Sequence, residues 1–291
     1  MTLRQFGDRG QTDGDLVAPG ESVGADPQVT LALRYAARSD IGLRRDGNED
    51  SACAGPHLLA VADGIGGHAA GEVASAAVIR VFAPLGMEDP GPDLVGTLID
   101  ATGAASVRLQ RLTARDRSIE SMGTTLTALL WSDGCAALCH VGDSRAYLLR
   151  DDRLIRITRD HTLVQSLIDQ GEITEDEAAT HRLRSLLLRA LDGQTIPEPD
   201  LIPVETCLDD RYLLCSDGLS GVVSEQTLCR ILTSVSDPNE ATWRLVQLAI
   251  EGGGPDNITC IVADVVDARD SRVPQASQPA FVGAVAGHVL R

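Results

Sequence analysis

The stretch that decides the fold lies at residues 57–82 and reads HLLAVADGIGGHAAGEVASAAVIRVF. Its first part, residues 57–62, is a short apolar run typical of a buried strand, and it ends abruptly at Asp63-Gly64. Across residues 69–82 apolar side chains recur at helical spacing, and Pro84 ends the pattern. The stretch therefore predicts a strand, an acidic turn at the end of that strand, and a helix.

The neighbouring segments continue this mixture of strands and helices. Upstream, residues 30–37 are predicted to form a strand, and downstream, residues 93–112 a second helix. Three strand-like segments separated by Asp-Gly and Gly-Asp turn signals follow, at residues 124–131, 136–141 and 146–149. Short strands joined by such turns predict an antiparallel meander.

The remaining chain divides into a flap, the end of the domain and two terminal segments. Residues 158–192 change to short, charged helical pieces, which predicts a mobile flap subdomain over the sheet edge. Further elements are expected at residues 209–215 (strand), 224–232 (helix), 237–252 (helix with Asp237 as N-cap) and 257–265 (strand). We therefore expect a domain at residues 29–267, a flexible leader at 1–28 and a tail at 268–291.

The composition argues against two kinds of partner. Lys and Arg number 25 against 42 Asp and Glu, and the formal net charge of −17 would repel nucleic-acid phosphate. The sequence has no apolar run of about 18 residues and no signal-peptide pattern, so we expect a cytoplasmic protein that binds no membrane. The 7 cysteines contain no CxxC pair, and they are interpreted as buried free thiols in a reducing compartment.

Four acidic turns stand where a predicted strand ends or begins. They are Ala62-Asp63-Gly64-Ile65-Gly66-Gly67-His68, Gly142-Asp143-Ser144-Arg145, Ser216-Asp217-Gly218 and Gly253-Gly254-Pro255-Asp256-Asn257. In each, an Asp lies beside Gly or Pro, where the backbone bends tightly, so carboxylates from distant segments can meet at one sheet edge. Converging carboxylates suit hard cations such as Mg²⁺ or Mn²⁺. A single Asp-Gly turn is a common hairpin signal, so the prediction depends on the four together.

With two further motifs, these turns resemble the metal-dependent protein phosphatase family (PPM, type 2C), and within it the compact bacterial serine/threonine phosphatases. The further motifs are SDIGLRRDGNED at residues 39–50 and MGTT at residues 122–125, and the last turn continues as DNIT at residues 256–259. The resemblance covers roughly residues 31–267. It implies an α+β fold: a four-layer α/β/β/α sandwich of two antiparallel sheets flanked by helices, with a small flap subdomain.

The same resemblance implies a set of metal ligands. Asp63 bridges two Mn²⁺ or Mg²⁺ ions, the Gly64 carbonyl binds one of them, and Asp217 and Asp256 complete the pair. In bacterial members the aspartate at the position of Asp143 joins that of Asp217 in holding a third, weaker ion. Two such ions lower the pKa of a bound water, which can then attack phosphorus, so no protein nucleophile is needed. The implied reaction is hydrolysis of phosphoserine and phosphothreonine esters on proteins.

The resemblance also gives roles to residues around the ligands. Arg45 matches the arginine that binds the substrate phosphate, where a planar guanidinium can hold two oxygens at once. Glu49 and Asp50 match an acidic pair that supports the metals through water, and Asn257 is placed with them. Many eukaryotic relatives carry His, a proposed general acid, where this chain has Ile65, so the proton donor to the leaving group is open.

Two histidines lie near these motifs. His68 resembles a position that bacterial members also occupy with His, and we interpret it as structural. His161 falls in the predicted flap, where it could meet substrate, but we interpret it as a surface residue.

Three alternatives stay open from the sequence. Residues 64–69 fit GxGxxA, as in a dinucleotide-binding oxidoreductase, but about 20 residues on, where an acidic residue is needed, the chain reads FAPLG. A pseudophosphatase would bind phosphoproteins without cleaving them, and the same fold could act on a phosphorylated anti-anti-sigma-type regulator. The leading prediction is a monomeric enzyme that acts on phosphoproteins, chiefly bacterial serine/threonine kinases and their targets.

Overall fold

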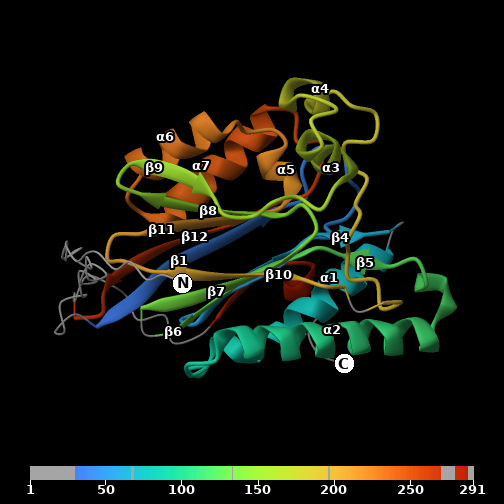
Figure 1. Ribbon diagram of the computed structural model, residues 1–291, viewed down its shortest axis with the longest axis horizontal. Coiled ribbons are helices and arrows are strands. Elements are labelled where there is room, and N and C mark those ends of the chain that lie inside the picture. Colours follow the sequence, from blue (N-terminus) through green and yellow to red (C-terminus); the bar gives the residue numbers. More distant parts are fainter. Residues whose placement is uncertain (1–29, 67–68, 133, 196, 270–278, 288–291) are drawn as a thin grey trace, which may run out of the picture.

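Two antiparallel β-sheets packed face to face form the centre of the molecule in the computed structural model (Figure 1). The structure describes residues 30–66, 69–132, 134–195, 197–269 and 279–287. Within these residues the first sheet has the order β1 (Leu31–Asp40), β12 (Ile258–Asp267), β11 (Arg211–Cys215), β8 (Arg145–Arg150), β9 (Arg153–Arg156). The second has the order β10 (Asp200–Glu205), β7 (Cys135–Val141), β6 (Leu126–Ser132), β3 (Leu58–Ala62), β2 (Ser51–Ala54), β13 (Ala280–Gly283). A small ladder joins β4 (Gly64–Ile65) to β5 (Gly123–Thr124).

Helices cover the outer face of each sheet (Figure 1). On the second sheet lie α1 (Ala69–Phe82) and α2 (Leu94–Arg115), with the 3-10 helices η1 (Ala83–Gly86) and η2 (Arg117–Ile119). On the first sheet lie α5 (Asp217–Ser220), α6 (Glu225–Ser234) and α7 (Pro238–Glu251). The side chains of Asp93, Ser224 and Asp237 accept backbone hydrogen bonds at the N-termini of α2, α6 and α7, which is why these helices begin there. The predicted four-layer sandwich is therefore confirmed.

Three apolar layers hold the sandwich together. One lies between the sheets and includes Leu59, Leu129, Leu214 and Ile261. The other two lie between each sheet and its helices. Neighbouring residues of β3 point to opposite faces, so Leu58 joins the layer under α1 and α2 while Leu59 joins the layer between the sheets. Burial on both faces explains why this strand is apolar throughout rather than alternating.

The predicted meander is wrong in its third strand. Strands β6 and β7 pair as expected, but β8 lies in the other sheet, between β11 and β9. Gly142 has a φ of 109° and the turn after it carries the chain across the sandwich. Thr127 Oγ1 donates to the carbonyl of Ser144 (2.9 Å), and the hydroxyls of Thr125 and Ser144 are 2.8 Å apart. These contacts fix the crossing, which a Gly-Asp signal cannot distinguish from a hairpin.

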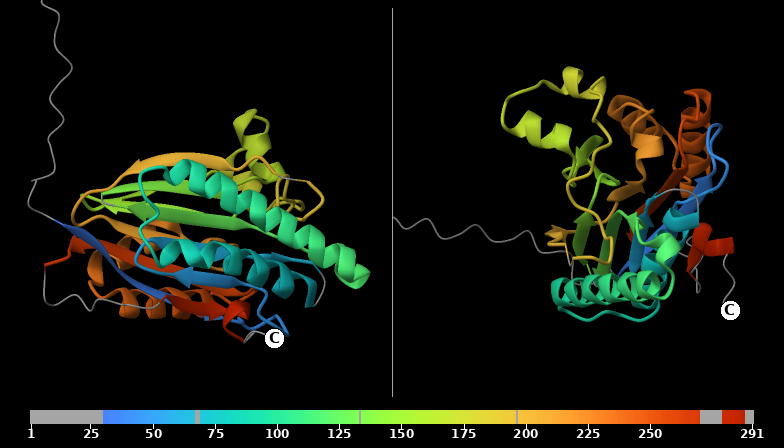
Figure 2. Two further views of the ribbon diagram at one scale, coloured as in Figure 1. Left: turned by 90° about the horizontal axis from the view of Figure 1, so that it is seen from below. Right: turned by 90° about the vertical axis from the view of Figure 1, so that its right-hand side faces the viewer.

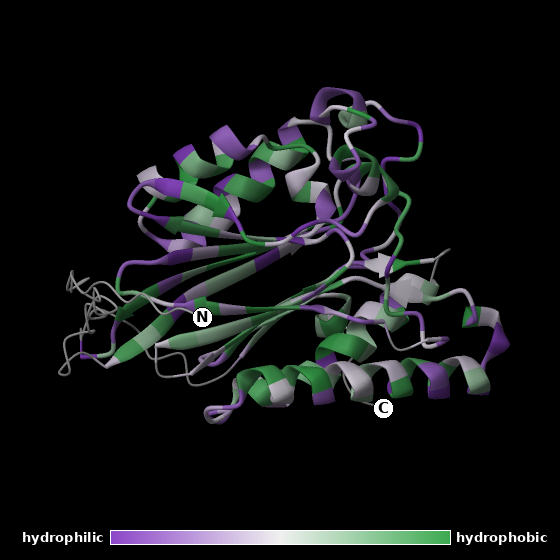
Figure 3. Cartoon of the chain, in the orientation of Figure 1, coloured by the Kyte–Doolittle hydropathy of each residue, from purple (hydrophilic) through white to green (hydrophobic). Residues whose placement is uncertain are grey.

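The flap and the C-terminal residues take different places in the fold. The segment predicted as a flap contains α3 (Leu163–Asp169) and α4 (Glu175–Ala179), and Figure 2 shows it projecting beyond the sandwich. Its outer part around α4 is largely hydrophilic, whereas the sheets are largely hydrophobic (Figure 3).

Residues 280–287, which the sequence assigns to a tail, form β13 and α8 (Ala284–Gly287) against β2 and α1. The predicted leader lies outside the described residues.

Two further findings concern the cysteines and the membrane. The seven cysteines are unpaired, as expected, but the prediction that all are buried is wrong. Cys53, Cys139, Cys215 and Cys260 are buried in strands, whereas Cys135 and Cys207 are exposed and Cys229 is half-buried. Cys135 and Cys207 lie near strand ends, where one apolar neighbour in the sequence does not ensure burial.

Among the described helices, none has the length and apolar character needed to cross a bilayer.

Candidate metal centre

The four acidic turns lie at the same end of the sandwich. They place Asp63 between β3 and β4, Asp143 between β7 and β8, Asp217 at the start of α5, and Asp256 just before β12. Strand register explains the convergence, because Cys215 at the end of β11 pairs with Arg145 at the start of β8 and with Cys260 near the start of β12. Segments far apart in the chain thus deliver their carboxylates to one place.

Asp63 is held by the predicted MGTT motif. Its backbone N–H donates to Thr125 Oγ1 (2.9 Å), and its carbonyl accepts from the Thr125 N–H (2.9 Å) and from Thr124 Oγ1 (2.8 Å). Gly64 pairs with Thr124 in the β4–β5 ladder. A Cβ on Gly64 would lie 2.4 Å from the Gly71 carbonyl oxygen, so no larger residue fits beside Asp63 without a backbone shift.

Asp217 is fixed by its two neighbours in the chain. The hydroxyl of Ser216 donates to Asp50 Oδ2 (2.7 Å), which ties the start of α5 to the acidic pair before β2. On the other side, a Cβ on Gly218 would lie 1.9 Å from the carbonyl oxygen of Asn257. The Asp-Gly sequence therefore lets two backbones approach closely enough for Asp217 to meet the turn before β12.

Asn257 organises the loop that carries Arg45. Its Oδ1 accepts from the Glu49 N–H (2.8 Å), and its Nδ2 donates to the carbonyls of Ile41 and Gly47 (both 2.9 Å). The side chain is nearly enclosed, with 3% of the residue exposed. Because one amide satisfies three backbone groups, it fixes the position of the loop relative to β12.

Arg45 lies at the mouth of the acidic centre. Its Nη2 is 2.7 Å from Asp256 Oδ2, and its side chain is 46% exposed. The other oxygen of Asp256 accepts from the backbone N–H of Asn257 (2.8 Å). A guanidinium that is anchored on one side and open to solvent on the other is placed to meet an anion arriving from outside.

His161 supports the turn that carries Asp143. Its backbone N–H donates to the Gly142 carbonyl (2.7 Å), and its ring Nδ1 accepts from the Gly142 N–H (3.1 Å). Because Nδ1 accepts, the ring proton is on Nε2, which lies 3.1 Å from Asp200 Oδ2. Burial lowers the pKa of this imidazole. The expectation of a surface histidine is therefore wrong, because the base of the flap folds His161 inward, where it is 7% exposed.

The carboxylates at this end raise one another's pKa. Burial raises the pKa of Asp63 well above its usual range, and the charges of Asp50, Asp217, Asp143 and Asp256 add to it. Burial and the charge of Asp217 raise the pKa of Asp143 to about 8, and burial raises that of Asp50 to about 7. The pKa of Asp217 is raised by burial and by Asp256. Such effects require the groups to lie close together in a poorly solvated place.

A pair of divalent cations fits this donor set. Within the described residues, Asp50 Oδ1 and Asp217 Oδ1 are buried and accept no hydrogen bond. Orphaned, mutually repelling carboxylate oxygens are stabilised by a hard cation, which removes the cost of burying their charge. In the same part of the chain no three His, Cys, Asp or Glu side chains surround one point as ligands of a single ion. Mg²⁺ in proteins usually keeps several water ligands, so a site for it does not need three such side chains around one point.

All the predicted site residues lie at this end of the fold. The structure brings together the five expected ligands, Asp63, Gly64, Asp143, Asp217 and Asp256, and the surrounding Arg45, Glu49, Asp50 and Asn257. His68 lies outside the described residues. The sequence analysis placed Ser216 and Thr125 in motifs but gave them no role, and it missed the supporting role of His161, because a buried imidazole beside a turn carries no distinguishing signal.

A sandwich of two antiparallel sheets with carboxylates converging at one end is the architecture expected of the metal-dependent phosphatase class. Comparison with known proteins gives the particular family: a model described as "Protein phosphatase 2C" matches residues 49–249, and the chain belongs to this family. The predicted resemblance is thereby confirmed, and the dinucleotide-binding alternative is excluded.

Several relatives are similar over most of the chain. The serine/threonine protein phosphatase PstP of Mycobacterium tuberculosis is 51% identical over 260 residues, 89% of this chain and 49% of that protein. This chain thus spans about half the length of that relative. The serine/threonine phosphatase stp of Listeria innocua is 33% identical over 236 residues, 78% of this chain and 94% of that protein.

Solved structures agree with this relationship. A crystal structure of M. tuberculosis PstP/Ppp is 51% identical, with a TM-score of 0.78 over 81% of this chain and 99% of that chain. A structure of the catalytic domain of PstP in complex with 2 manganese ions has the same identity and TM-score, over 82% of this chain and 100% of that one. The fold is therefore that of a PstP-type phosphatase, and a related structure holds two metal ions.

Proposed function

We propose that this chain hydrolyses phosphoserine and phosphothreonine esters on proteins with the help of Mn²⁺ or Mg²⁺. The observation that carries the proposal is the convergence of buried carboxylates from four distant turns, with mutually raised pKa values, at the end of a protein phosphatase 2C fold. When bound, the two ions supply an activated water for attack on phosphorus.

The chain's own residues bind and position the reactants. Asp63 would bridge the ions, the Gly64 carbonyl would bind one of them, and Asp217 and Asp256 would complete the set. Thr125 and the close-packed glycines hold these groups before any metal arrives, so little reorganisation is needed. Arg45 would leave its contact with Asp256 to hold two phosphate oxygens and so orient the ester.

A third, weaker ion would be held by Asp143 together with Asp217. Asp143 lies in a turn fixed by His161, and the charge of Asp217 contributes to its raised pKa, which places the two carboxylates near each other. With fewer carboxylates than the central pair, this position is expected to bind its ion less tightly.

The proton for the leaving alkoxide is expected to come from water. Ile65 has no group that can donate one, and its place in the short β4–β5 ladder is next to Gly64. Solvent access beside the exposed Arg45 makes a water donor consistent with the shape of the site.

Substrates are proposed to be phosphoproteins, chiefly serine/threonine kinases and their targets. The phosphatase names of the relatives support a protein substrate for those proteins. A phosphorylated anti-anti-sigma-type regulator is the alternative substrate for the same site. Location in the cytoplasm and a monomeric state stay predictions from the sequence.

A phosphothreonine peptide tests the activity directly. The purified chain should release phosphate with added Mn²⁺, lose this activity with a chelator and regain it when Mn²⁺ returns. A preparation that is folded by circular dichroism but releases no phosphate from phosphoserine or phosphothreonine peptides at any Mn²⁺ concentration would refute the proposal. Loss of phosphate from one purified phosphoprotein and not another would then distinguish a kinase substrate from an anti-anti-sigma-type regulator.

A further inference from the structure

Residues 280–287, the C-terminal strap, lie beyond the segment matched by the family model, which ends at residue 249. The strap consists of β13, which adds an outer strand to the second sheet, and the short α8, which packs against α1. Figure 2 shows α8 in red at the edge of the molecule. In the register of this pairing, Ala280 lies opposite Ala54 and Gly283 lies opposite Ser51. The strap therefore runs toward the acidic pair Glu49-Asp50.

The strap touches the backbone of Asp50 at its sharpest bend. Gly283 has a φ of 78°, and a Cβ on it would lie 2.2 Å from the Asp50 carbonyl oxygen. The next residue, Ala284, donates its N–H to the same oxygen at 2.7 Å. Only glycine allows this bend and this approach together, so the contact is specific to the position.

A second contact continues to the residues on either side of Asp50. The N–H of Val285 donates to Ser51 Oγ (3.1 Å), which is 2.9 Å from the hydroxyl of Ser75 on α1. Ser75 in turn donates to the carbonyl of Glu49 (2.5 Å). The strap and α1 thus contact three successive residues from outside the metal centre: Glu49 and Asp50 through their backbone carbonyls, and Ser51 through its hydroxyl.

The side chain of Asp50 connects this region of the backbone to the proposed metal ligand Asp217. Its Oδ2 accepts from Ser216, the residue directly before Asp217, and the side chain is fully buried. A shift of the Asp50 backbone would therefore move or release the start of α5. Supporting groups of this kind orient metal ligands and affect the affinity for the metal.

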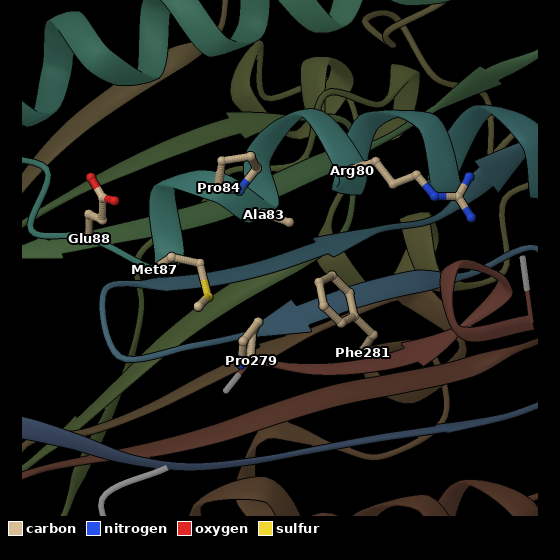
Figure 4. Close-up of a pocket in the computed structure, with 7 residues that line it drawn as sticks. All are labelled: Arg80, Ala83, Pro84, Met87, Glu88, Pro279 and Phe281. Atoms are coloured by element: carbon tan, nitrogen blue, oxygen red, sulfur yellow. The ribbon is translucent and has the colours of Figure 1, made fainter. Parts of the chain in front are cut away.

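The strap is held unevenly along its length. Beside its first part lies an open cleft of about 840 Å³ lined by Arg80, Ala83, Pro84, Met87, Glu88, Pro279 and Phe281 (Figure 4). Phe281 is 38% exposed there, whereas Ala284 and Val285 are each 7% exposed. The end of the strap that contacts Asp50 is therefore more deeply buried than Phe281 beside the cleft.

We propose that the C-terminal strap is a positioning element that sets the affinity of the metal centre by fixing the backbone of Asp50. The proposal rests on the proposed metal-dependent function, because it assigns the strap a role at that same site. It assigns no contact between the strap and substrate or metal.

Two glycines of the strap provide a matched test. Gly283→Ala places a methyl against the Asp50 carbonyl, whereas Gly287→Ala adds the same methyl where no atom of the described residues lies within 4 Å. The measurement is the Kd for Mn²⁺ by calorimetry on the full chain after chelator treatment. We expect Gly283→Ala to raise this Kd about tenfold, and Gly287→Ala to leave it within about twofold of the wild type.

A second variant, Ala284→Pro, tests the same contact in case Gly283→Ala does not fold. Ala284→Pro removes the N–H that reaches Asp50 and adds a ring at the first position of a helix, where proline is tolerated. Circular dichroism and the melting temperature in chelator show whether each variant is folded. A folded Gly283→Ala or Ala284→Pro protein with the wild-type Kd would overturn the proposal, even if its melting temperature is lower.

The two proposals fail separately. Wild-type activity combined with an unchanged Kd in the folded strap variants would refute the positioning role and leave the phosphatase function intact. A wild-type chain that binds Mn²⁺ more tightly than Gly283→Ala but cleaves no phosphoester would refute the function and support the strap's effect on the metal centre.

Discussion

Replacing Asp217 by Asn removes one negative charge from the centre of the acidic end while keeping the shape of the side chain. With the carboxylate gone, the proposed site loses a ligand shared between ions. A loss of about 3 kcal/mol of transition-state stabilisation corresponds to a rate roughly a hundredfold lower. We therefore expect kcat at saturating Mn²⁺ to fall by at least that factor. Retention of more than about a tenth of the wild-type kcat would show that the site is misplaced.

The same substitution should stabilise the protein when metal is absent. Two carboxylates about 6 Å apart repel each other by roughly 3 kcal/mol at an effective dielectric constant of about 20. Asp217 contributes such repulsion to Asp63, Asp143 and Asp50. Because Asp143, with its pKa raised to about 8, is only partly ionised at pH 8, we expect a net gain of about 1–2 kcal/mol in unfolding free energy. For a domain of this size the melting temperature should rise by about 3–6 °C.

The pH dependence makes this expectation specific. A carboxyl with a raised pKa keeps its proton longer in the folded protein than in the unfolded chain, so stability falls as pH rises from about 4 toward the folded-state pKa. For Asp50 and Asp143 that window extends to about 7 and about 8. Calorimetric melting in chelator should show the gain from Asp217→Asn at pH 8 and almost none at pH 5. Asp100→Asn, on the exposed face of α2, is the control. An equal gain at both pH values, or a loss at pH 8, would refute the reasoning.

Three further changes test other parts of the centre. Asp143→Ala should shift the Mn²⁺ activation curve to higher concentration without abolishing activity, and a curve that matches the wild type would remove the third-ion role. Arg45→Ala should chiefly raise KM for a phosphopeptide, so an unchanged KM would remove the role in phosphate binding. Gly218→Ala forces a methyl to 1.9 Å from a backbone oxygen and should lower the unfolding free energy by about 1–3 kcal/mol. Gly103→Ala, where no described residue lies within 4 Å of the added methyl in α2, should be neutral or slightly stabilising by chemical denaturation. Equal losses in the two variants would contradict the packing argument.

Much of the fold could be predicted from the chain because its signals are local. The helix at residues 69–82 has the predicted bounds, and Asp237 is the N-cap as predicted. Asp93 and Ser224 cap the helices that were expected to begin at these residues. A capping side chain acts on the next few backbone N–H groups, so its effect is determined within one turn. The apolar run before Asp63 likewise indicates a strand buried on both faces.

The sequence also predicted which residues would carry the proposed chemistry. Carboxylates beside glycine in four ordered turns predict a site for hard cations whatever the path of the chain between them. What the pattern does not contain is the partner of each strand. Strand β8 was expected beside β7 and instead crosses to the other sheet, because the hydroxyls of Thr125 and Thr127 bind the turn at Ser144. Pairing between strands depends on contacts across the sandwich, which local residue types do not encode.

Only the tertiary structure decided the surroundings of the centre. His161 lies in a charged segment and has the appearance of a surface residue in the sequence, yet the base of the flap buries it against Gly142. Residues 280–287 have the composition of a tail, yet two backbone N–H groups dock them on Asp50 and Ser51. Residue types thus determined which groups can bind metal and phosphate. How those groups are held depends on hydrogen bonds between segments more than 200 residues apart, such as that of Val285 with Ser51, and these exist only once the chain has folded.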